Sequence, residues 1–162
     1  LLLNLSNAQI SASGNALFIY GDFNSTSLKL GNADQTNRNG DTYVTYCFSE
    51  VAGYSKFGSY TGNGNADGPF VFTGFRPAFL IWKNSSSVRN WHMIDNTRDT
   101  FNPVDLQLYP NLNTNEYPET QGYDFLSNGF KIRESANFAN NNGGTYIYLA
   151  FAESPFKNAR AR

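Results

Sequence analysis

The sequence has little of the chemistry that most catalytic and metal sites use. It contains one cysteine, one methionine and one histidine in 162 residues, and only 15% of its residues are charged. A lone cysteine, Cys47, cannot form an intrachain disulfide, and no cluster of Cys and His is present to hold zinc. We therefore expect no metal site and no cofactor.

Charge and hydrophobic runs are also sparse. The 12 basic and 13 acidic residues give a net charge of -1, and no basic run is present. This argues against nucleic-acid binding, which depends on neutralising phosphates. No apolar run approaches the ~20 residues that a membrane helix needs, so we expect no membrane insertion. With 40% hydrophobic residues, the sequence is that of a folded domain.

Aromatic residues and asparagine are abundant, with 14 Phe, 10 Tyr and 22 Asn. Short β-rich runs alternate with turns of Gly, Asn and Pro, and helical periodicity is hard to find. About ten to twelve short strands at this spacing predict an all-β, antiparallel two-sheet sandwich. Strands are predicted at residues 16–20, 27–30, 42–50, 57–60, 70–72, 78–82, 91–94, 124–126, 130–133 and 145–153, and the clearest of them is 42–50.

Two parts of the sequence resemble each other, at residues 22–50 and 124–153. Each contains a strand, an Asn-rich loop and a longer strand introduced by Asn-Gly. We predict an internal hairpin repeat, with positive φ at Gly40 and Gly143 in the turns. The matching alternation predicts that six side chains point into the core: Val44, Tyr46, Phe48, Ile147, Leu149 and Phe151.

The repeat does not predict two domains, because each copy of about 30 residues is too small for its own core. We expect one sandwich domain over residues 1–162, in which residues 1–21 are the least certain segment. We also expect this domain to be the C-terminal part of a longer polypeptide.

The sequence offers few catalytic groups. His92 lies in a predicted strand, and no Gly-x-Ser-x-Gly elbow precedes it. Cys47 is predicted to be buried within a strand, where a thiol is inert. Glu50 and Glu153 form either an acid pair or, as we favour, polar ends of two repeated strands. We therefore expect no enzymatic activity and no catalytic residues.

Alternating oxygen-bearing side chains occur at Asn63, Asn65 and Asp67. They resemble the start of a calcium loop, but no Glu follows at the distance that would close it. Turn formation explains the same residues, and we favour it.

A binding site is predicted where a flat ring lies among charged groups. Trp82 follows an apolar run and is expected in the core, whereas Trp91 is flanked by polar residues. The candidate ligand-binding residues are Arg89, Trp91, Asp95 and Arg98. They combine stacking with charged hydrogen bonding, as glycan recognition requires. The alternative is that Asp95 and Arg98 brace a loop. The loops expected to carry binding span residues 62–68, 84–90 and 95–102.

Several motifs resemble a domain of uncharacterised function in tail-fibre and other virion proteins of bacteriophages. They are Tyr54-Ser55-Lys56-Phe57-Gly58-Ser59-Tyr60, Gly68-Pro69-Phe70, Gly74-Phe75-Arg76-Pro77 and Leu108-Tyr109-Pro110-Asn111. The resemblance runs from about Asp22 to Phe156. It implies a concanavalin A-like jelly roll, a fold that lectins and glycanases share, so the fold leaves the function open.

The resemblance also implies a setting. We expect a structural domain of a phage tail fibre or similar appendage, located in the virion and synthesised in the host cytoplasm, where the absence of disulfides is normal. The expected partners are other virion proteins, further copies of the chain in a homo-oligomer (a trimer by the resemblance), and host-surface glycan. The alternatives are a glycan-cleaving enzyme of concanavalin A-like fold and a purely structural spacer or decoration domain.

Overall fold

The computed structural model describes residue 6, residues 26–31 and residues 33–154. The chain divides into two compact units, one formed by Leu1–Gln9 with Ser49–Arg162 and the other by Ile10–Phe48. The predicted strand at residues 16–20 and the first four residues of the predicted repeat lie outside the described residues.

The unit Ile10–Phe48 contains one helical turn among its described residues, α1 (Asp34–Asn37). The Tyr43 hydroxyl donates to the Asp34 carbonyl at 2.6 Å and accepts from the Arg38 N–H at 2.9 Å, so the chain after α1 is tied back to it. The strands predicted at residues 27–30 and 42–50 are not formed. Cys47, expected to be buried in the second of these strands, is exposed.

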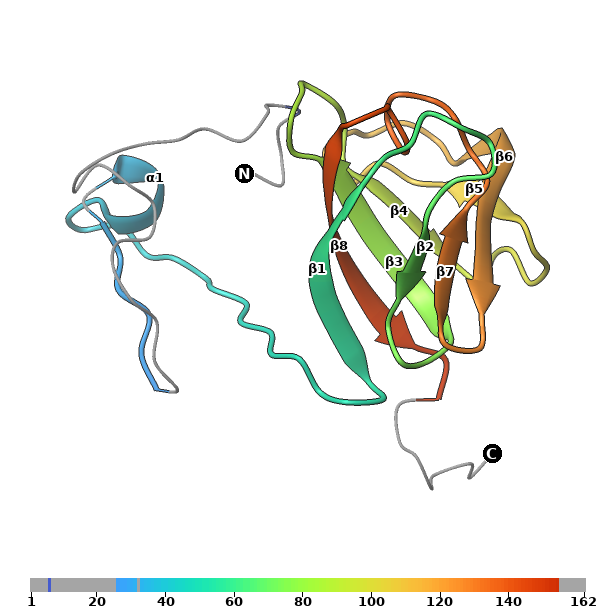
Figure 1. Ribbon diagram of the computed structural model, residues 1–162. Coiled ribbons are helices and arrows are strands. Elements are labelled where there is room, and N and C mark those ends of the chain that lie inside the picture. The colour runs from blue at the N-terminus through green and yellow to red at the C-terminus, as the bar shows by residue number, and fades with distance from the viewer. Residues whose placement is uncertain (1–5, 7–25, 32, 155–162) are drawn as a thin grey trace. The chain divides into compact units, whose positions relative to one another are not determined.

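The other unit holds an all-β sandwich, as predicted (Figure 1). Its described strands form two antiparallel sheets of four strands each, in the orders β1-β8-β3-β4 and β2-β7-β6-β5. The strands are β1 (Ser55–Thr61), β2 (Phe70–Phe72), β3 (Pro77–Asn84), β4 (His92–Asp95), β5 (Val104–Gln107), β6 (Tyr117–Leu126), β7 (Gly129–Ile132) and β8 (Thr145–Ala152). No helix in the described part of the chain is long and apolar enough to cross a membrane.

The hairpins follow the sequence pattern closely. The strands predicted at residues 78–82 and 91–94 correspond to β3 and β4, which pair as a hairpin with a long loop, in a register that sets Leu80 opposite Ile94 and Trp82 opposite His92. Leu80, Trp82 and Ile94 are completely buried, so the prediction that Trp82 belongs to the core is confirmed. Phe125 and Phe130 face each other across the β6–β7 hairpin, and both are buried between the sheets.

The predicted core face of β8 is wrong. Its fully or almost fully buried side chains are Tyr146, Tyr148 and Ala150, whereas Ile147, Leu149 and Phe151 lie on the opposite face and are half-buried. Both faces of this strand are apolar, so the alternation alone did not say which one faces the core. The interior also gives the Tyr146 hydroxyl two partners, the Asn137 carbonyl at 2.8 Å and the Asn141 N–H at 2.7 Å.

The predicted internal repeat does not extend to the structure. Val44, Tyr46 and Phe48 are 78%, 81% and 62% exposed, and residues 42–50 form no strand. The corresponding strand β8 lies between β1 and β3, which supply hydrogen bonds on both sides. A strand requires such backbone partners, and similar side-chain alternation cannot replace them.

The turn prediction is confirmed at both glycines. Gly40 has φ of 88° and Gly143 has φ of 74°. A Cβ at either position would meet no atom within 4 Å, so the left-handed backbone, rather than lack of space, makes glycine suitable there.

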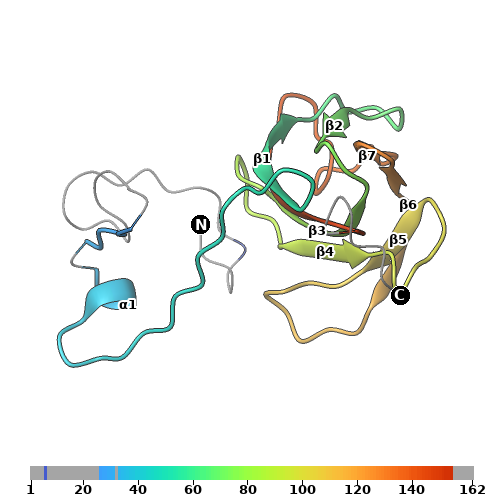
Figure 2. The same cartoon turned by 90° about the horizontal axis from the view of Figure 1, so that it is seen from below.

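The two sides of the sandwich differ. On one side, an antiparallel bridge between Met93 of β4 and Leu108, just after β5, joins the two sheets through N–H···O bonds of 2.9 Å in both directions. On the other side, β1 and β2 are the outer strands of their sheets among the described strands. Figure 2 shows β4 beside β5, with β1 and β2 at the opposite side.

Candidate functional site

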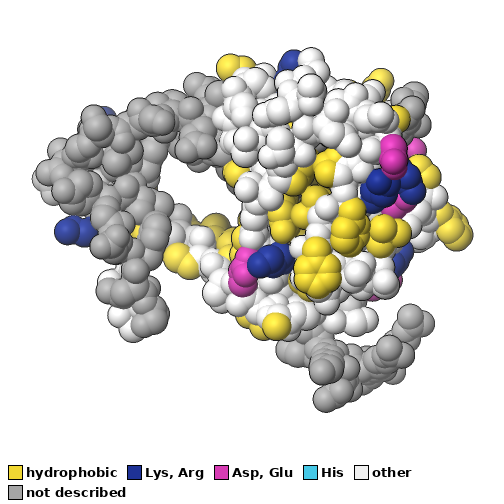
Figure 3. Space-filling view, in the orientation of Figure 1, with side chains coloured by type: hydrophobic (Ala, Val, Ile, Leu, Met, Phe, Trp, Pro, Cys, Tyr) yellow, Lys and Arg dark blue, Asp and Glu magenta, His cyan; other side chains and the backbone are white. Residues whose placement is uncertain are grey.

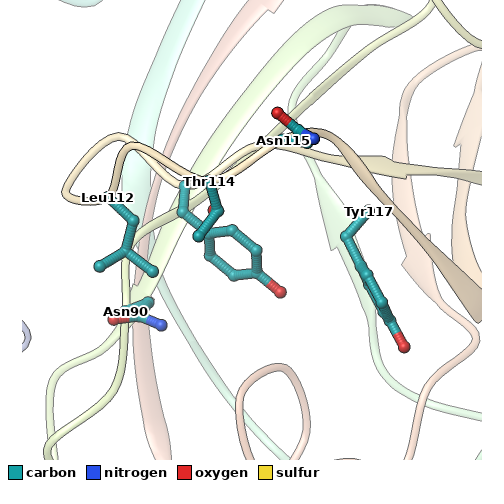
Figure 4. A pocket seen from close by; sticks show the side chains of 6 residues that line it. Asn90, Leu112, Thr114, Asn115 and Tyr117 are labelled. Atoms are coloured by element: carbon teal, nitrogen blue, oxygen red, sulfur yellow. The ribbon is translucent and has the colours of Figure 1, made fainter.

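A pocket of about 300 Å³ lies beside the bridge between Met93 and Leu108. It is formed by the connection between β5 and β6, by the first residue of β6 and by one residue of the β3–β4 loop. In Figure 4, Tyr117 stands across the opening from Leu112 and Asn90. The six lining residues are uncharged: Asn90, Tyr109, Leu112, Thr114, Asn115 and Tyr117.

The side chain of Asn111 fixes one wall of the pocket. Its Oδ1 accepts from the Trp91 N–H at 2.9 Å, and its Nδ2 donates to Asn90 Oδ1 at 3.0 Å. The Leu112 N–H donates to the Tyr109 carbonyl at 3.0 Å, which closes a turn after β5. These bonds hold the β5–β6 connection against the β3–β4 loop, so Asn90 lies in the same site as Leu112.

The Tyr109 ring rests on a buried aromatic stack. Its centroid is 5.0 Å from His92, in an edge-on arrangement. The His92 ring is itself stacked between Trp82 and Phe138, at 5.1 Å and 4.8 Å. Rings packed in this way cannot turn freely, so the base of the pocket is preorganised.

His92 is neutral in this position. Its Nδ1 lies 2.7 Å from Gln107 Oε1, which requires the proton on Nδ1 in the neutral ring. Burial lowers the pKa of His92 to about 4; the Gln107 hydrogen bond opposes this shift and the nearby Lys83 charge adds to it. The polar partner of this strand histidine is therefore Gln107.

Next in sequence to Tyr117 of the pocket, Glu116 forms a charged clamp with Arg98 and Asp95. Arg98 Nε donates to Asp95 Oδ2 at 2.6 Å, and its Nη1 donates to Glu116 Oε2 at 2.7 Å. Partial burial alone would raise the pKa of Asp95, but hydrogen bonds from the Arg98 backbone and guanidinium hold it below its ordinary value. The clamp connects the end of β4 to the residue before Tyr117, which is the bracing role considered from the sequence.

The other two predicted ligand-binding residues lie near the pocket but do not line it. Trp91 is only 6% exposed, so its ring is not available for stacking on a ligand. Arg89 is exposed, and its carbonyl accepts from the buried Lys83 ammonium at 2.5 Å. Lys83 Nζ also lies over the Trp91 ring, 6.0 Å from its centroid. Burial lowers the pKa of Lys83.

The sequence reasoning missed the two tyrosines of the pocket. No strand is predicted at residues 102–117, and Pro103, Pro110 and Pro118 exclude a helix there. A usable signal was present in two Tyr-Pro pairs, Tyr109-Pro110 and Tyr117-Pro118, at the two ends of a polar connection. Proline restricts the preceding residue to an extended backbone, which helps to hold each tyrosine in one orientation.

The remaining candidates have structural partners. Glu50 pairs with Lys56 at 2.8 Å and Glu153 pairs with Arg76 at 2.9 Å, so each of these acids is engaged by a cation. In the loop after β1, the Asn63 side chain accepts from the Asn65 N–H at 3.0 Å, which is the turn contact expected from the sequence. The described residues contain no group of three or more His, Cys, Asp or Glu that could hold a metal ion.

Comparison with known proteins identifies a family for this chain but no function. The fold is an antiparallel β-sandwich. A pocket lined by uncharged residues, among them aromatic and amide side chains, lies beside the bridge that joins its two sheets. The chain belongs to the family described as Domain of unknown function (DUF7483), which it matches over residues 1–155. No curated protein matches the chain, and no solved structure matches it.

Proposed function

We propose that this protein is a non-catalytic domain of a bacteriophage virion that binds host-surface glycan in the pocket around Tyr109 and Tyr117. The observation that carries the glycan part is the composition of the pocket, in which two aromatic rings stand among amide and hydroxyl groups. The virion setting, in a tail fibre or similar appendage, rests on the sequence resemblance.

The chemistry of the pocket suits a neutral sugar. The flat apolar face of a pyranose stacks on an aromatic ring, and Tyr117 is 56% exposed and stands at the opening. Asn90, Asn115 and Thr114 offer donors and acceptors for sugar hydroxyls. The rigid support of Tyr109 by His92 lowers the entropy lost on binding, because this ring is already ordered.

The same composition favours binding over cleavage. Glycoside hydrolysis uses two carboxyl groups about 5–9 Å apart across the scissile bond. None of the six lining residues has a carboxyl group. The nearest acid in sequence, Glu116, is held by Arg98 at 2.7 Å. A glycan-cleaving enzyme of the same fold is therefore the weaker alternative.

The assembly and the finer fold class belong to the same proposal. Tail-fibre proteins act as homo-oligomers attached to other virion proteins, and we propose both kinds of partner for this domain. We also propose that the sandwich is of the concanavalin A-like jelly-roll type, which its two four-stranded antiparallel sheets support.

The test is binding of the purified chain to a glycan array, followed by calorimetry with the best polysaccharide. Tyr117→Ala should weaken binding by at least about tenfold, equivalent to about 1.4 kcal/mol. Tyr109→Ala should weaken it to a similar degree. Phe101→Ala is the matched control, because Phe101 is 80% exposed and does not line the pocket.

The outcomes separate the alternatives. Release of new reducing ends from the bound polysaccharide would identify an enzyme. Absence of binding to every glycan from the host surface would favour the spacer or decoration role. Binding that Tyr117→Ala and Tyr109→Ala leave unchanged, with intact folding, would place the glycan site elsewhere on the domain.

A further inference from the structure

Two amide side chains at one wall of the pocket have orientations that the backbone fixes. The Trp91 N–H donates to the Asn111 side chain at 2.9 Å, and a backbone N–H can only donate, so the Asn111 atom at this contact is Oδ1. The other end of the same amide is Nδ2, which donates to the Asn90 side chain at 3.0 Å. The Asn90 atom that accepts this bond is therefore Oδ1. One backbone N–H thus determines which way both amides face.

This arrangement gives the pocket a hydrogen-bond donor. Asn90 lines the pocket, and its Oδ1 is engaged by Asn111. In Figure 4 the nitrogen of Asn90 lies on the side that faces Tyr117, and its oxygen lies on the other side. An amide NH2 group donates hydrogen bonds and does not accept them. It therefore suits a ligand group that can only accept, such as a carbonyl oxygen.

An apolar side chain lies next to this donor. Leu112 lines the same pocket and is 45% exposed. Figure 4 shows its methyl groups pointing toward Asn90. The Leu112 N–H donates to the Tyr109 carbonyl at 3.0 Å, so a closed turn positions this side chain. A ligand group that joins a carbonyl oxygen to a methyl group would bond to Asn90 and also remove apolar surface from water at Leu112.

The charges around the pocket argue against ionised sugar substituents. The lining residues are uncharged, so the carboxylate of an acidic sugar or the ammonium group of an amino sugar would find no counter-ion among them. The guanidinium of Arg98 is already paired with Asp95 and Glu116, at 2.6 Å and 2.7 Å. An unsubstituted hydroxyl would bond to Asn90 but would leave Leu112 exposed to water. A neutral acetamido group satisfies both the donor and the apolar side chain.

We propose that the pocket selects a sugar that bears an N-acetyl group, such as N-acetylglucosamine or N-acetylgalactosamine. This inference rests on the proposed glycan binding and specifies the substituent that the pocket recognises. The acetamido carbonyl oxygen accepts from Asn90 Nδ2, its methyl group packs against Leu112, and its N–H donates to the hydroxyl of Thr114. A volume of about 300 Å³ is small for a ligand site, so the pocket holds one such sugar residue.

The test compares methyl glycosides that differ only in the substituent next to the anomeric carbon. NMR titrations of the purified chain give the Kd values of the N-acetylglucosamine and N-acetylgalactosamine glycosides and those of the glucose and galactose glycosides. At least one N-acetyl sugar should bind about tenfold more tightly than its parent hexose, because a hydrogen bond and a buried methyl group are gained together. The glucosamine glycoside, which carries an ammonium group, should bind no more tightly than the glucose glycoside.

Asn90→Asp separates the donor from the other sugar contacts. The carboxylate still accepts from Asn111 but has no proton to donate to a carbonyl oxygen. A sugar hydroxyl can donate as well as accept, so the affinity for the glucose glycoside should remain while the preference for the N-acetyl sugar disappears. Asn128→Asp is the matched control, because Asn128 is exposed in the β6–β7 turn and does not line the pocket. It should retain the preference.

Asn111→Asp tests the orientation of Asn90 from outside the pocket lining. The new carboxylate still accepts from the Trp91 N–H but has no proton to donate to Asn90. Asn90 should then turn its Nδ2 toward that carboxylate and its Oδ1 toward the pocket, so the preference for the N-acetyl sugar should fall. Asn111 is a positioning residue in this scheme. A role in folding alone would lower the affinities for the glucose glycoside and the N-acetyl sugar equally.

A second apolar surface serves as a control for sugar stacking elsewhere. Figure 3 shows hydrophobic side chains gathered over β2 and between it and β1. Phe72 of β2 is 63% exposed and does not line the pocket. Phe72→Ala should leave both affinities unchanged. Loss of sugar binding in this variant would place the site over β2 and overturn the inference.

The remaining outcomes distinguish this inference from the proposed function. Equal affinities of the wild type for N-acetyl sugars and their parent hexoses would overturn the inference and leave glycan binding intact. A preference that persists in both Asn90→Asp and Asn111→Asp would also overturn it, because the amide donor would not be its source. Failure of the wild type to bind any of these glycosides, or any glycan on the array, would overturn the proposed function and this inference together.

Discussion

The neutral, buried His92 makes a quantitative prediction about stability and pH. The ordinary pKa of histidine is 6.5, and burial lowers that of His92 to about 4 in the folded protein. The unfolded chain therefore binds a proton at higher pH than the folded chain does. Between these two values, stability falls as the pH falls, and above pH 6.5 this group contributes no pH dependence.

The size of the effect follows from the two pKa values. Because one pKa unit corresponds to about 1.4 kcal/mol, the full effect is about 3 kcal/mol at pH 4. From pH 7.5 to pH 5 the expected loss is about 2 kcal/mol. The surroundings of His92 support a large pKa shift, since the side chain is 4% exposed and its neighbours on both faces are aromatic rings.

The assay is urea unfolding followed by tryptophan fluorescence at pH 7.5, 6 and 5. Both tryptophans lie in the sandwich unit, so the signal reports on its unfolding. His92→Phe keeps the stacking and removes the titration. Its free energy of unfolding should fall between pH 7.5 and pH 5 by about 2 kcal/mol less than that of wild type.

The substitution also removes the partner of Gln107 Oε1, at a cost of about 1–3 kcal/mol at every pH. The double variant His92→Phe, Gln107→Leu removes that polar group and should recover part of the loss. Neither cost affects the predicted pH dependence, because the free energies of unfolding are compared between pH values within each protein. Equal pH dependence in wild type and both variants would show that His92 does not titrate as the structure requires.

Two further predictions concern packing. Phe130→Ala should lower the free energy of unfolding by about 3–5 kcal/mol because the ring is fully buried. Phe151→Ala should lower it clearly less, because its ring is half-buried on the outer face. Equal losses by urea unfolding would contradict this ranking. Gly129→Ala should destabilise the sandwich by about 1–3 kcal/mol or more, because its Cβ would lie 2.2 Å from the Val71 carbonyl oxygen. Gly143→Ala meets no neighbouring atom and should cost only the ~1–2 kcal/mol of a left-handed backbone; a thermal shift for Gly143→Ala as large as that for Gly129→Ala would argue against this difference.

The sequence predicted the local elements of the sandwich better than their environment. β2 and the β3–β4 and β6–β7 hairpins occur where short apolar runs meet Gly, Asn or Ser turns. These elements are decided by residues near one another in the chain. The core face of β8 was predicted wrongly because it depends on which sheet lies opposite, a long-range property that alternation does not contain.

The candidate site also depends on long-range contacts that the local sequence does not contain. The sequence drew attention to Trp91, Asp95 and Arg98, but none of them lines the pocket, since Trp91 is buried and Arg98 is paired with Asp95 and Glu116. Tyr109 and Tyr117 stand in it, and they are brought together by the Asn111 hydrogen bonds and the Arg98–Glu116 pair. Those contacts join residues about 20 positions apart, so single-residue properties could not reveal them.

The predicted repeat of residues 22–50 and 124–153 fails at its longer strand. Residues 42–50 and β8 share a strand-forming pattern, but only β8 has neighbours on both sides. A strand-forming pattern does not by itself produce a strand, because the backbone also requires neighbouring strands for its hydrogen bonds. The chain meets β1 just after this segment, through the bridge between Val51 and Ser55 and the pair of Glu50 with Lys56. The sequence-based prediction that Val44, Tyr46 and Phe48 face a core is therefore wrong, because alternation within one segment does not reveal whether a second apolar layer covers it.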